Sequence, residues 1–396
     1  MSIVSLKFDS NKTFRWRQVK VFQNQIEEPE VMIKNKTREF MKRLQEAFLL
    51  YEFKEAICAD RYEVTDLRQD RRNGYRYRGL NTGFGYIEGI KVPRGRKGGY
   101  SFSLFKRYKR RSEEFDNIVL YAVLCGMSNR RVRQFFETFY ESKLSEATIS
   151  NVVAQLDEEL KQFRTFPIAI NYPYLIIDGL SVSILSGGIQ EEKVVIFAMG
   201  LDNSGKADLL AFMLVDSESE VAYQALFNDL YRRGLKNIEL LIHDGSKGIV
   251  AAANWVYPYA RHQRCIFHKQ MNLLHNIRRQ FHKKAIIEDS QAIYEANTKR
   301  EALIRANRFK RRWIAKEPYA IKNFFKDFEA TLTYFDFPKS IREAIKTTNY
   351  LERYFEEIRR RIKLIGCFRN QKSCERYIYG LIKITYKNLK DVVKQC

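Results

Sequence analysis

No run of about 18 consecutive apolar residues, the length that a membrane-spanning helix needs, occurs in this sequence of 396 residues. The first ten residues also lack the basic flank and apolar core of a secretory signal. Cysteine is scarce, and its six residues, at positions 58, 125, 265, 367, 374 and 396, are too scattered to suggest a disulfide framework. We therefore expect a soluble, cytoplasmic protein without a membrane partner, with its cysteines present as thiols.

Acidic residues are outnumbered, because Asp and Glu total 47 against 70 Lys and Arg, which gives a formal net charge of +23. The excess is uneven: Arg68–Arg111 holds 14 basic residues against only Asp70 and Glu88. This concentration of positive charge indicates a polyanionic partner, with a merely solvated basic surface as the alternative. At 45% hydrophobic residues the composition is globular, and the length allows two or three domains.

The amino-terminal third predicts a small basic α/β region over 1–112. Apolar residues recur at spacings of three and four in 35–59, which is typical of an amphipathic helix. Turn residues and basic residues then alternate from Arg72 to Arg78, and three glycines follow within 82–92. We interpret this stretch as short strands and loops.

Helical periodicity resumes over 117–156 and breaks twice, each time just before a serine that can cap a new helix, Ser128 or Ser145. Three short helices with tight turns suggest a helix-turn-helix unit over 113–165. The third of these helices, 145–156, would be the reading helix, yet it contains no Lys or Arg. That helix could therefore serve in packing or dimer formation as well as in reading a DNA groove, and the sequence does not distinguish these roles.

From residue 172 onward, the order of elements becomes informative. Strands are expected at 174–185, 193–201, 209–215, 238–242 and 264–267, with helices at 217–233, capped by Ser217, and at 247–256. This βββαβαβ order, in an α/β protein, is that of a ribonuclease-H-like mixed sheet. Residues 269–344 have almost no strand signal and predict an all-helical insertion, and helices at 347–364 and 372–393 close the chain. The catalytic domain would thus comprise 166–268 and 345–396.

Two aspartates occupy positions that favour a metal site. Asp178 interrupts an otherwise apolar strand, where an unpaired carboxylate would cost several kcal/mol. Asp244 stands at the carboxyl end of the fourth strand, and both aspartates are followed by glycine. In a ribonuclease-H-like order the first and fourth strands are neighbours, so the two carboxylates would face a gap that Mg²⁺ (or Mn²⁺) could bridge.

A third carboxylate should come from the helix expected at 347–364, where Glu352, Glu356 and Glu357 compete. Asn349 and Glu356 share a face with Glu352 by helical spacing, whereas Glu357 does not, so spacing narrows the choice without settling it. Three carboxylates can hold two metal ions, which activate the attacking oxygen and stabilise the leaving oxygen in a displacement on phosphorus.

Cys265 and His268 have the Cys-x-x-His spacing that zinc sites use. The sequence offers no second such pair, so our interpretation is a packed strand end beside the carboxylates. In that position Cys265 and His268, like Asn349, could support the metal ligands without binding the metal themselves, or touch DNA.

Several motifs together resemble one known family. They are Ala59-Asp60-Arg61-Tyr62-Glu63, Arg72-Asn73-Gly74-Tyr75-Arg76, Val92-Pro93-Arg94-Gly95-Arg96, Gly126-Met127-Ser128, Ala147-Thr148-Ile149-Ser150, Asp178-Gly179, Asp216-Ser217-Glu218-Ser219-Glu220, Asp244-Gly245, Gln263-Arg264-Cys265 with His268, and Thr347-Thr348-Asn349 with Glu352-Arg353. In this order they are similar to those of the IS256 group of insertion-sequence transposases, related to eukaryotic Mutator transposases. The chain departs from the family pattern at Ser246, where leucine or histidine is usual.

The resemblance implies that Glu352 completes a catalytic and metal-binding triad with Asp178 and Asp244, and that the helical insertion separates Asp244 from Glu352. It implies a transposase that binds terminal inverted repeats in double-stranded DNA, cuts the element ends, and joins their 3′-hydroxyls to target DNA as a homodimer or larger oligomer associated with the nucleoid. Expected DNA contacts are Arg72, Arg76, Arg78, Arg94, Arg96, Arg130 and Arg131. A metal-dependent nuclease without strand transfer and a non-catalytic DNA-binding regulator are the alternatives.

Overall fold

The computed structural model of the chain describes residues 28–105 and 110–385, which form two compact units. The first unit comprises the described residues of Met1–Leu120 together with Ser128–Ile149. The second comprises Tyr121–Met127 and the described residues of Ser150–Cys396. No helix in the described ranges is long and apolar enough to cross a membrane.

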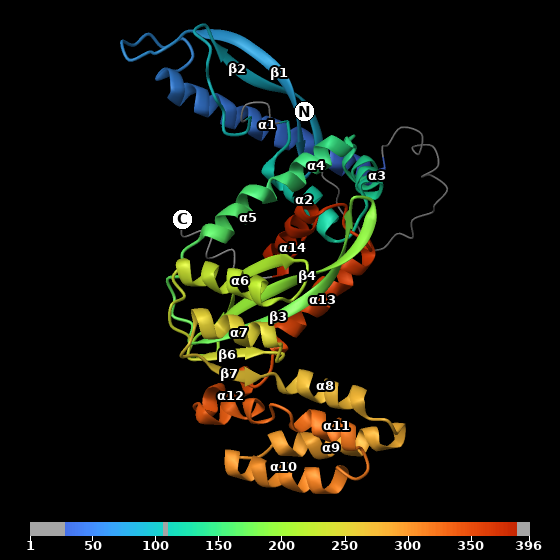
Figure 1. Cartoon of the computed structure of the whole chain (residues 1–396). Helices are drawn as coiled ribbons and strands as arrows, with labels where there is room; N and C mark the ends of the chain where they lie inside the picture. Colours follow the sequence, from blue (N-terminus) through green and yellow to red (C-terminus); the bar gives the residue numbers. More distant parts are fainter. Residues whose placement is uncertain (1–27, 106–109, 386–396) are drawn as a thin grey trace, which may run out of the picture. The chain divides into compact units, whose positions relative to one another are not determined.

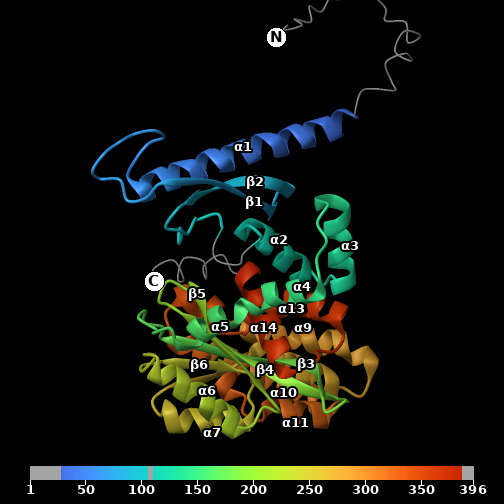
Figure 2. The same cartoon turned by 90° about the horizontal axis from the view of Figure 1, so that it is seen from above.

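The first unit is built on a long helix and a hairpin. Helix α1 (Pro29–Ile57) spans most of the expected helical segment 35–59 and starts earlier, with a proline in its first turn. The apolar residues that predicted its buried face, Phe40, Leu44, Phe48 and Tyr51, are exposed, and it buries Leu49, Phe53 and Ile57 instead. Its buried face packs on the hairpin of β1 (Arg72–Thr82) and β2 (Gly85–Gly95), as Figure 2 shows. Strands are found here as expected, but the expectation that they are short is wrong, because each has 11 residues. Gly79, which favours a loop by sequence, instead leaves room for the ring of Tyr86.

Three short helices follow, as expected: α2 (Glu113–Leu124), α3 (Asn129–Tyr140) and α4 (Glu146–Ala154). Both serine caps are confirmed. The Ser128 hydroxyl accepts the Arg131 N–H at 3.4 Å, and the Ser145 hydroxyl accepts the Thr148 N–H at 3.1 Å. A helix-turn-helix that reads DNA stays a prediction.

The second unit contains a mixed five-stranded sheet with the strand order β5-β4-β3-β6-β7 (Figure 1). Its strands are β3 (Tyr174–Ser186), β4 (Ile189–Leu201), β5 (Ala207–Val215), β6 (Leu240–His243) and β7 (Arg261–Arg264). The first three form an antiparallel meander, whereas β6 joins β3 in parallel and β7 joins β6 in parallel. The expected adjacency of the first and fourth strands of this sheet is confirmed.

Helices cover both faces of the sheet (Figures 1 and 2). On one face, α6 (Glu220–Arg232) and α7 (Lys247–Val256) bury apolar side chains against β3, β4 and β6. On the other, α13 (Asn349–Ile365) packs Phe355 on Phe197, and α5 (Leu156–Thr165) packs Phe163 near Phe212. Helix α14 (Gln371–Thr385) lies beside α5, and the part of its expected span beyond 385 is outside the described residues. The sheet is therefore the middle layer of three.

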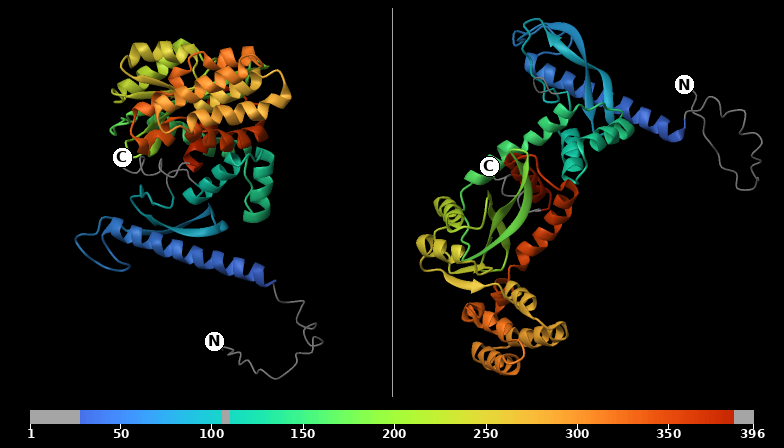
Figure 3. Two further views of the ribbon diagram at one scale, coloured as in Figure 1. Left: turned by 90° about the horizontal axis from the view of Figure 1, so that it is seen from below. Right: turned by 45° about the vertical axis from the view of Figure 1, so that its right-hand side comes forward.

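The insertion between β7 and α13 is helical throughout, as expected for 269–344. Its elements are α8 (Ile266–Asn276), a 3-10 turn (Gln280–His282), α9 (Lys283–Tyr294), α10 (Lys299–Trp313), α11 (Pro318–Phe325), two further 3-10 turns (Glu329–Thr331 and Thr333–Asp336) and α12 (Lys339–Ile345). Figure 3 shows α8–α11 beyond the β7 edge of the sheet. Within the insertion, the buried Glu317 carboxylate accepts the N–H groups of Arg278 and Arg279 and contacts His282.

Of the boundaries that differ from the prediction, two lie next to the candidate site. The fifth strand ends at Arg264, and Ile266 and Phe267 belong to the first turn of α8 rather than to a strand at 264–267. A short apolar run cannot tell a buried strand from the start of a buried helix. Helix α6 is capped by Ser219, whose hydroxyl accepts the Ala222 N–H, rather than by Ser217.

Candidate active site

Asp178 and Asp244 come to the same level on neighbouring strands. In the parallel β3–β6 pair, Leu175 lies opposite Leu241 and Ile176 opposite Ile242. Two residues further along, the chains reach Asp178 and Asp244. Since adjacent strands lie ~4.8 Å apart, the register brings the two carboxylates into one small region.

Asp178 is held by hydrogen bonds from two elements. Its Oδ1 accepts the N–H of Gly179 at 2.9 Å, and the hydroxyl of Thr348, at the start of α13, also bonds to its side chain. Burial raises the pKa of Asp178 to about 6, with a further upward contribution from the Asp244 charge, against the lowering effects of His268, the Gly179 N–H and Thr348. At neutral pH the Asp178 carboxylate is therefore ionised although burial disfavours its charge. A positive charge bound beside it would stabilise the ionised form.

Asp244 is fixed by its own loop. Its Oδ1 accepts the N–H of Ser246 at 2.9 Å, and its carbonyl accepts the Nε of Arg264 at 3.1 Å. Gly245 has φ +99°, and a Cβ there would meet the Arg264 side chain at 2.2 Å, so glycine is required. Because residue 246 bonds to Asp244 through its backbone N–H, the unusual serine does not disturb this contact.

Cys265 and His268 border the acidic pair. Cys265 is buried and its thiol lies 3.4 Å from both the hydroxyl and the backbone nitrogen of Thr348, so it links the start of α8 to the start of α13. Burial would lower the pKa of His268, but a hydrogen bond with Cys265 and the charges of Asp178 and Asp244 raise it to about 9. His268 is therefore a cation facing both aspartates, and its buried Nδ1 has no hydrogen-bond partner among the described residues.

Glu352 interacts electrostatically with His268. It is half-buried in the first turn of α13, and burial raises its pKa, with Glu356 adding to the rise and His268 and Arg359 opposing it. Glu356 is exposed. Asn349, expected beside Glu352, is also exposed, and its backbone N–H bonds to the Thr347 hydroxyl.

Glu357 serves a different purpose. Its carboxylate accepts hydrogen bonds from Arg360 at 2.9 Å and Arg361 at 2.7 Å, which lower its pKa. It is thus committed to ion pairs on its own helix, and the choice for a third carboxylate on α13 lies between Glu352 and Glu356.

Glu218 joins the site although the sequence reasoning did not select it as a site residue. Because α6 begins after Ser219, Glu218 lies in the loop before the helix, and a Cβ on Gly179 would be 2.0 Å from its Oε1. Burial raises the pKa of Glu218, as do the charges of Asp244 and Asp178, against a hydrogen bond from Tyr223 and the charge of His268. The acidic motif at 216–220 is the available signal, but a helix capped by Ser217 would have Glu218 in its first turn.

The donor set suits a hard divalent cation. Asp178, Asp244 and Glu218 act on one another through their negative charges, and two of their pKa values are raised partly for that reason. Carboxylate oxygens are the ligands that Mg²⁺ and Mn²⁺ prefer. Within the described ranges, no three His, Cys, Asp or Glu side chains converge closely enough to hold a metal ion as they stand. Metal binding would therefore require side-chain movement, whichever glutamate joins the pair.

The expected DNA contacts lie in the first unit and fall into two groups. Two of them are half-buried and support the fold: Arg72 lies over the Phe53 ring at 5.3 Å, and Arg78 lies over the Phe105 ring at 4.5 Å. The others are exposed, namely Arg76, Arg94, Arg96, Arg130 and Arg131. The exposed group is the better candidate for phosphate contacts.

Fold and site together define an α/β protein with carboxylates brought together where β6 ends beside the parallel strand β3. The chain belongs to the Mutator family of transposases, whose family model matches residues 11–391. It is 31% identical to the transposase for insertion sequence element ISRM5 of Rhizobium meliloti (strain 1021), over 89% of this chain and 88% of that protein. It is 32% identical to the transposase for insertion sequence element IS256 in transposon Tn4001 of Staphylococcus aureus, over 83% and 84%. With the transposase for IS406 of Burkholderia multivorans (strain ATCC 17616 / 249) the identity is 31%, over 81% and 83%.

Proposed function

We propose that this chain is the transposase of an insertion sequence, which cuts DNA at the element ends and joins the resulting 3′-hydroxyls to target DNA. The observation that carries the proposal is the register of β3 against β6, because it brings Asp178 level with Asp244. A ribonuclease-H-like catalytic domain, formed by 166–268 and 345–396, is supported by the strand order β5-β4-β3-β6-β7. Family membership supports the same function.

Mg²⁺ or Mn²⁺ bound by these carboxylates would activate the attacking oxygen and stabilise the leaving oxygen in an in-line displacement on phosphorus. The protein's own contribution is to orient the ligands. Thr348 and the Gly179 N–H hold Asp178, while the Ser246 N–H holds Asp244. Among the described residues, only Oδ1 of Asp244 accepts a hydrogen bond, which leaves its Oδ2 for a ligand.

The third metal ligand is proposed to be Glu352. The resemblance to the IS256 group implies this role, and the electrostatic interaction of Glu352 with His268 supports it. Glu218 is the alternative third ligand, since it already acts on both aspartates. His268, between these carboxylates, would then serve as a positive group that faces the reacting phosphate.

We propose double-stranded DNA as the partner, held by the basic first unit and by the exposed arginines named above. A transposase must hold two element ends at once, so we propose a homodimer or larger oligomer as the working form. Because much of the attraction would be to phosphates, DNA affinity should fall steeply with salt.

Joining of a labelled, pre-cut element-end duplex to a supercoiled plasmid, in Mg²⁺, tests this function. Because the same site can use a 3′-hydroxyl as nucleophile, we expect a labelled plasmid product from the unmodified chain. A control duplex with a 3′-deoxy end should give none. Plasmid nicking without a joined product would indicate a nuclease, and DNA binding without either product would indicate a regulator.

A further inference from the structure

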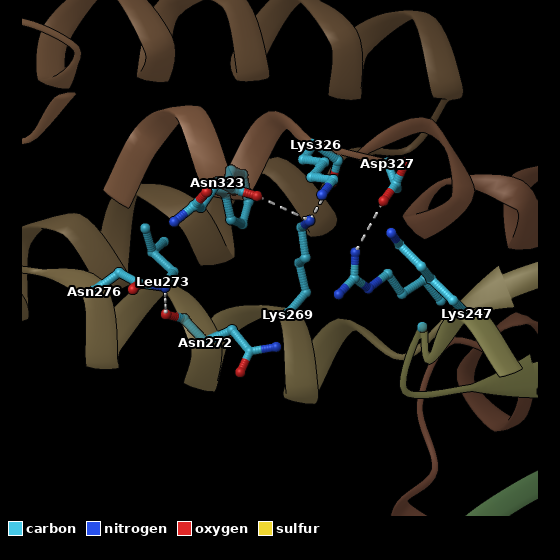
Figure 4. Close-up of a pocket in the computed structure, with 11 residues that line it drawn as sticks. Lys247, Lys269, Asn272, Leu273, Asn276, Asn323, Lys326 and Asp327 are labelled. Carbon is cyan, nitrogen blue, oxygen red and sulfur yellow. Dashed lines mark hydrogen bonds and ion pairs between the residues drawn. The ribbon is translucent and has the colours of Figure 1, made fainter. Parts of the chain in front are cut away.

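A cavity of about 250 Å³ opens beside Gly245, the residue that follows Asp244. Its walls come from the start of α7, from Arg264 and α8, and from the end of α11 with the turn after it (Figure 4). Four of the lining side chains are cationic and one is anionic: Lys247, Arg264, Lys269, Lys326 and Asp327. Three asparagines add neutral polar groups: Asn272, Asn276 and Asn323. The cavity is much larger than the ~30 Å³ share of one water molecule and carries an excess of positive charge.

Arg264 presents the end of its guanidinium to this space. Its Nε is used inside the protein, where it donates to the carbonyl of Asp244. Among the described residues, neither Nη atom has a hydrogen-bond acceptor, and the charge partner Asp327 lies 3.7 Å from Nη1 with its own side chain 63% exposed. The fork is therefore anchored at one side and available for a bidentate contact, the geometry in which arginine recognises phosphate.

Lys269 supplies a buried cation in the same cavity. Its side chain rises from α8, as Figure 4 shows, and its Nζ donates to the carbonyls of Asn323 and Lys326. Burial lowers the pKa of Lys269 to about 8, and the nearby positive charge of Arg264 adds to the lowering. Two cations held together in a half-enclosed space repel each other, and a bound anion would relieve that repulsion.

Lys247, on α7, is another cationic residue that lines the cavity. It is exposed, forms no ion pair with a described residue, and is the first residue of its helix. A positive charge at a helix amino terminus is unfavourable, so the helix itself gains nothing from a lysine here. An anion bound in the cavity would offset the repulsion between Lys247 and the helix terminus, because it would interact favourably with both.

We propose that this cavity binds a backbone phosphate of DNA, next to the phosphate that reacts at Asp178 and Asp244. The inference rests on the proposed joining function. Arg264 bonds to the carbonyl of Asp244 on one side and lines the cavity on the other, so a phosphate bound there would set the position of the strand relative to the acidic pair. A nucleic-acid strand offers such a second phosphate at each neighbouring nucleotide.

The test uses Lys247→Gln, because this exposed side chain should be removable without unfolding the chain. We would measure equilibrium binding of an element-end duplex at several salt concentrations, in Ca²⁺ and without target DNA. Loss of one phosphate contact should reduce the slope of log affinity against log salt by about 0.9. Lys236→Gln is the matched control, since Lys236 is also exposed, lies outside the cavity and forms no ion pair with a described residue. Its slope should equal that of the unmodified chain.

Two sources of the phosphate can be separated. A smaller slope in the binding assay assigns the phosphate to the element end. An unchanged slope there, together with a smaller salt dependence of joining when target DNA is limiting, assigns it to the target strand. If Lys247→Gln changes neither slope and unfolds at the same temperature as the unmodified chain, the proposal is wrong. Because the binding assay needs no chemistry, a chain that binds DNA but never joins it would overturn the proposed function and still leave this result readable.

Discussion

Replacing Asp178 or Asp244 by alanine should reduce strand joining roughly 10³-fold or more, because loss of metal assistance removes several kcal/mol of transition-state stabilisation. DNA affinity should change little, because it depends on the basic residues that attract phosphates. Removing a carboxylate removes none of that attraction. The measurement is the rate of joining of pre-cut ends to a plasmid at saturating Mg²⁺, together with end-duplex affinity in Ca²⁺.

The matched control for these variants is Glu192→Ala, an exposed carboxylate on β4, opposite Ser183 in the β3–β4 hairpin. It should join at the rate of the unmodified chain. Substantial joining by Asp178→Ala or Asp244→Ala would show that the acidic pair is not the catalytic centre. Equal loss of joining and of thermal stability would show only that the variant is misfolded, so both are measured together.

Asp178→Asn should stabilise the metal-free protein at neutral pH. The pKa of Asp178 in the folded chain is about 6, against an ordinary value of 3.8, because burial and the Asp244 charge disfavour the ionised form. The stabilisation associated with the protonated carboxyl is complete below pH ~4 and is lost as the pH rises through about 6. The variant should therefore exceed the unmodified chain in unfolding free energy by on the order of 1–3 kcal/mol at pH 7.5, with the difference vanishing near pH 4.

Urea unfolding with a chelator present, across this pH range, measures the effect. Mg²⁺ should then raise the unfolding midpoint of the unmodified chain and not that of Asp178→Asn. Asp202→Asn is the opposing control, because hydrogen bonds from the Ser204 hydroxyl, from backbone N–H groups and the charge of Lys206 lower the pKa of Asp202. That variant should not gain stability at neutral pH. If Asp202→Asn raised the free energy of unfolding at neutral pH as much as Asp178→Asn, the unfavourable ionisation assigned to Asp178 would be contradicted.

The parts of the site that could be predicted are those that local pattern controls. Short apolar runs locate β3 and β6, and an aspartate inside an apolar strand such as β3 is unusual. The element order then predicts that these two strands are neighbours, which the register confirms. Serine caps at Ser128 and Ser145 followed from the same local chemistry.

Other parts depend on contacts between distant segments and have no local signal. Glu218 enters the site only because the cap of α6 is Ser219, two residues later than the Ser217 expected from the sequence. Thr348 approaches Asp178 because α13 packs against β3, and Lys269 finds its carbonyl partners more than 50 residues away on α11 and its following turn. A pattern of residue types cannot fix such positions, since each depends on how whole helices pack.

Binding of Mn²⁺ to the protein in complex with an element-end duplex tests the central claim most directly. The number of bound ions and their affinity would be measured for the unmodified chain and for Asp178→Asn, Asp244→Asn, Glu352→Gln and Glu218→Gln. We expect tight binding by the unmodified chain, loss of it in both aspartate variants, and a smaller loss in whichever glutamate variant removes the third ligand. Undiminished Mn²⁺ binding by Asp178→Asn and Asp244→Asn would contradict the proposed metal site.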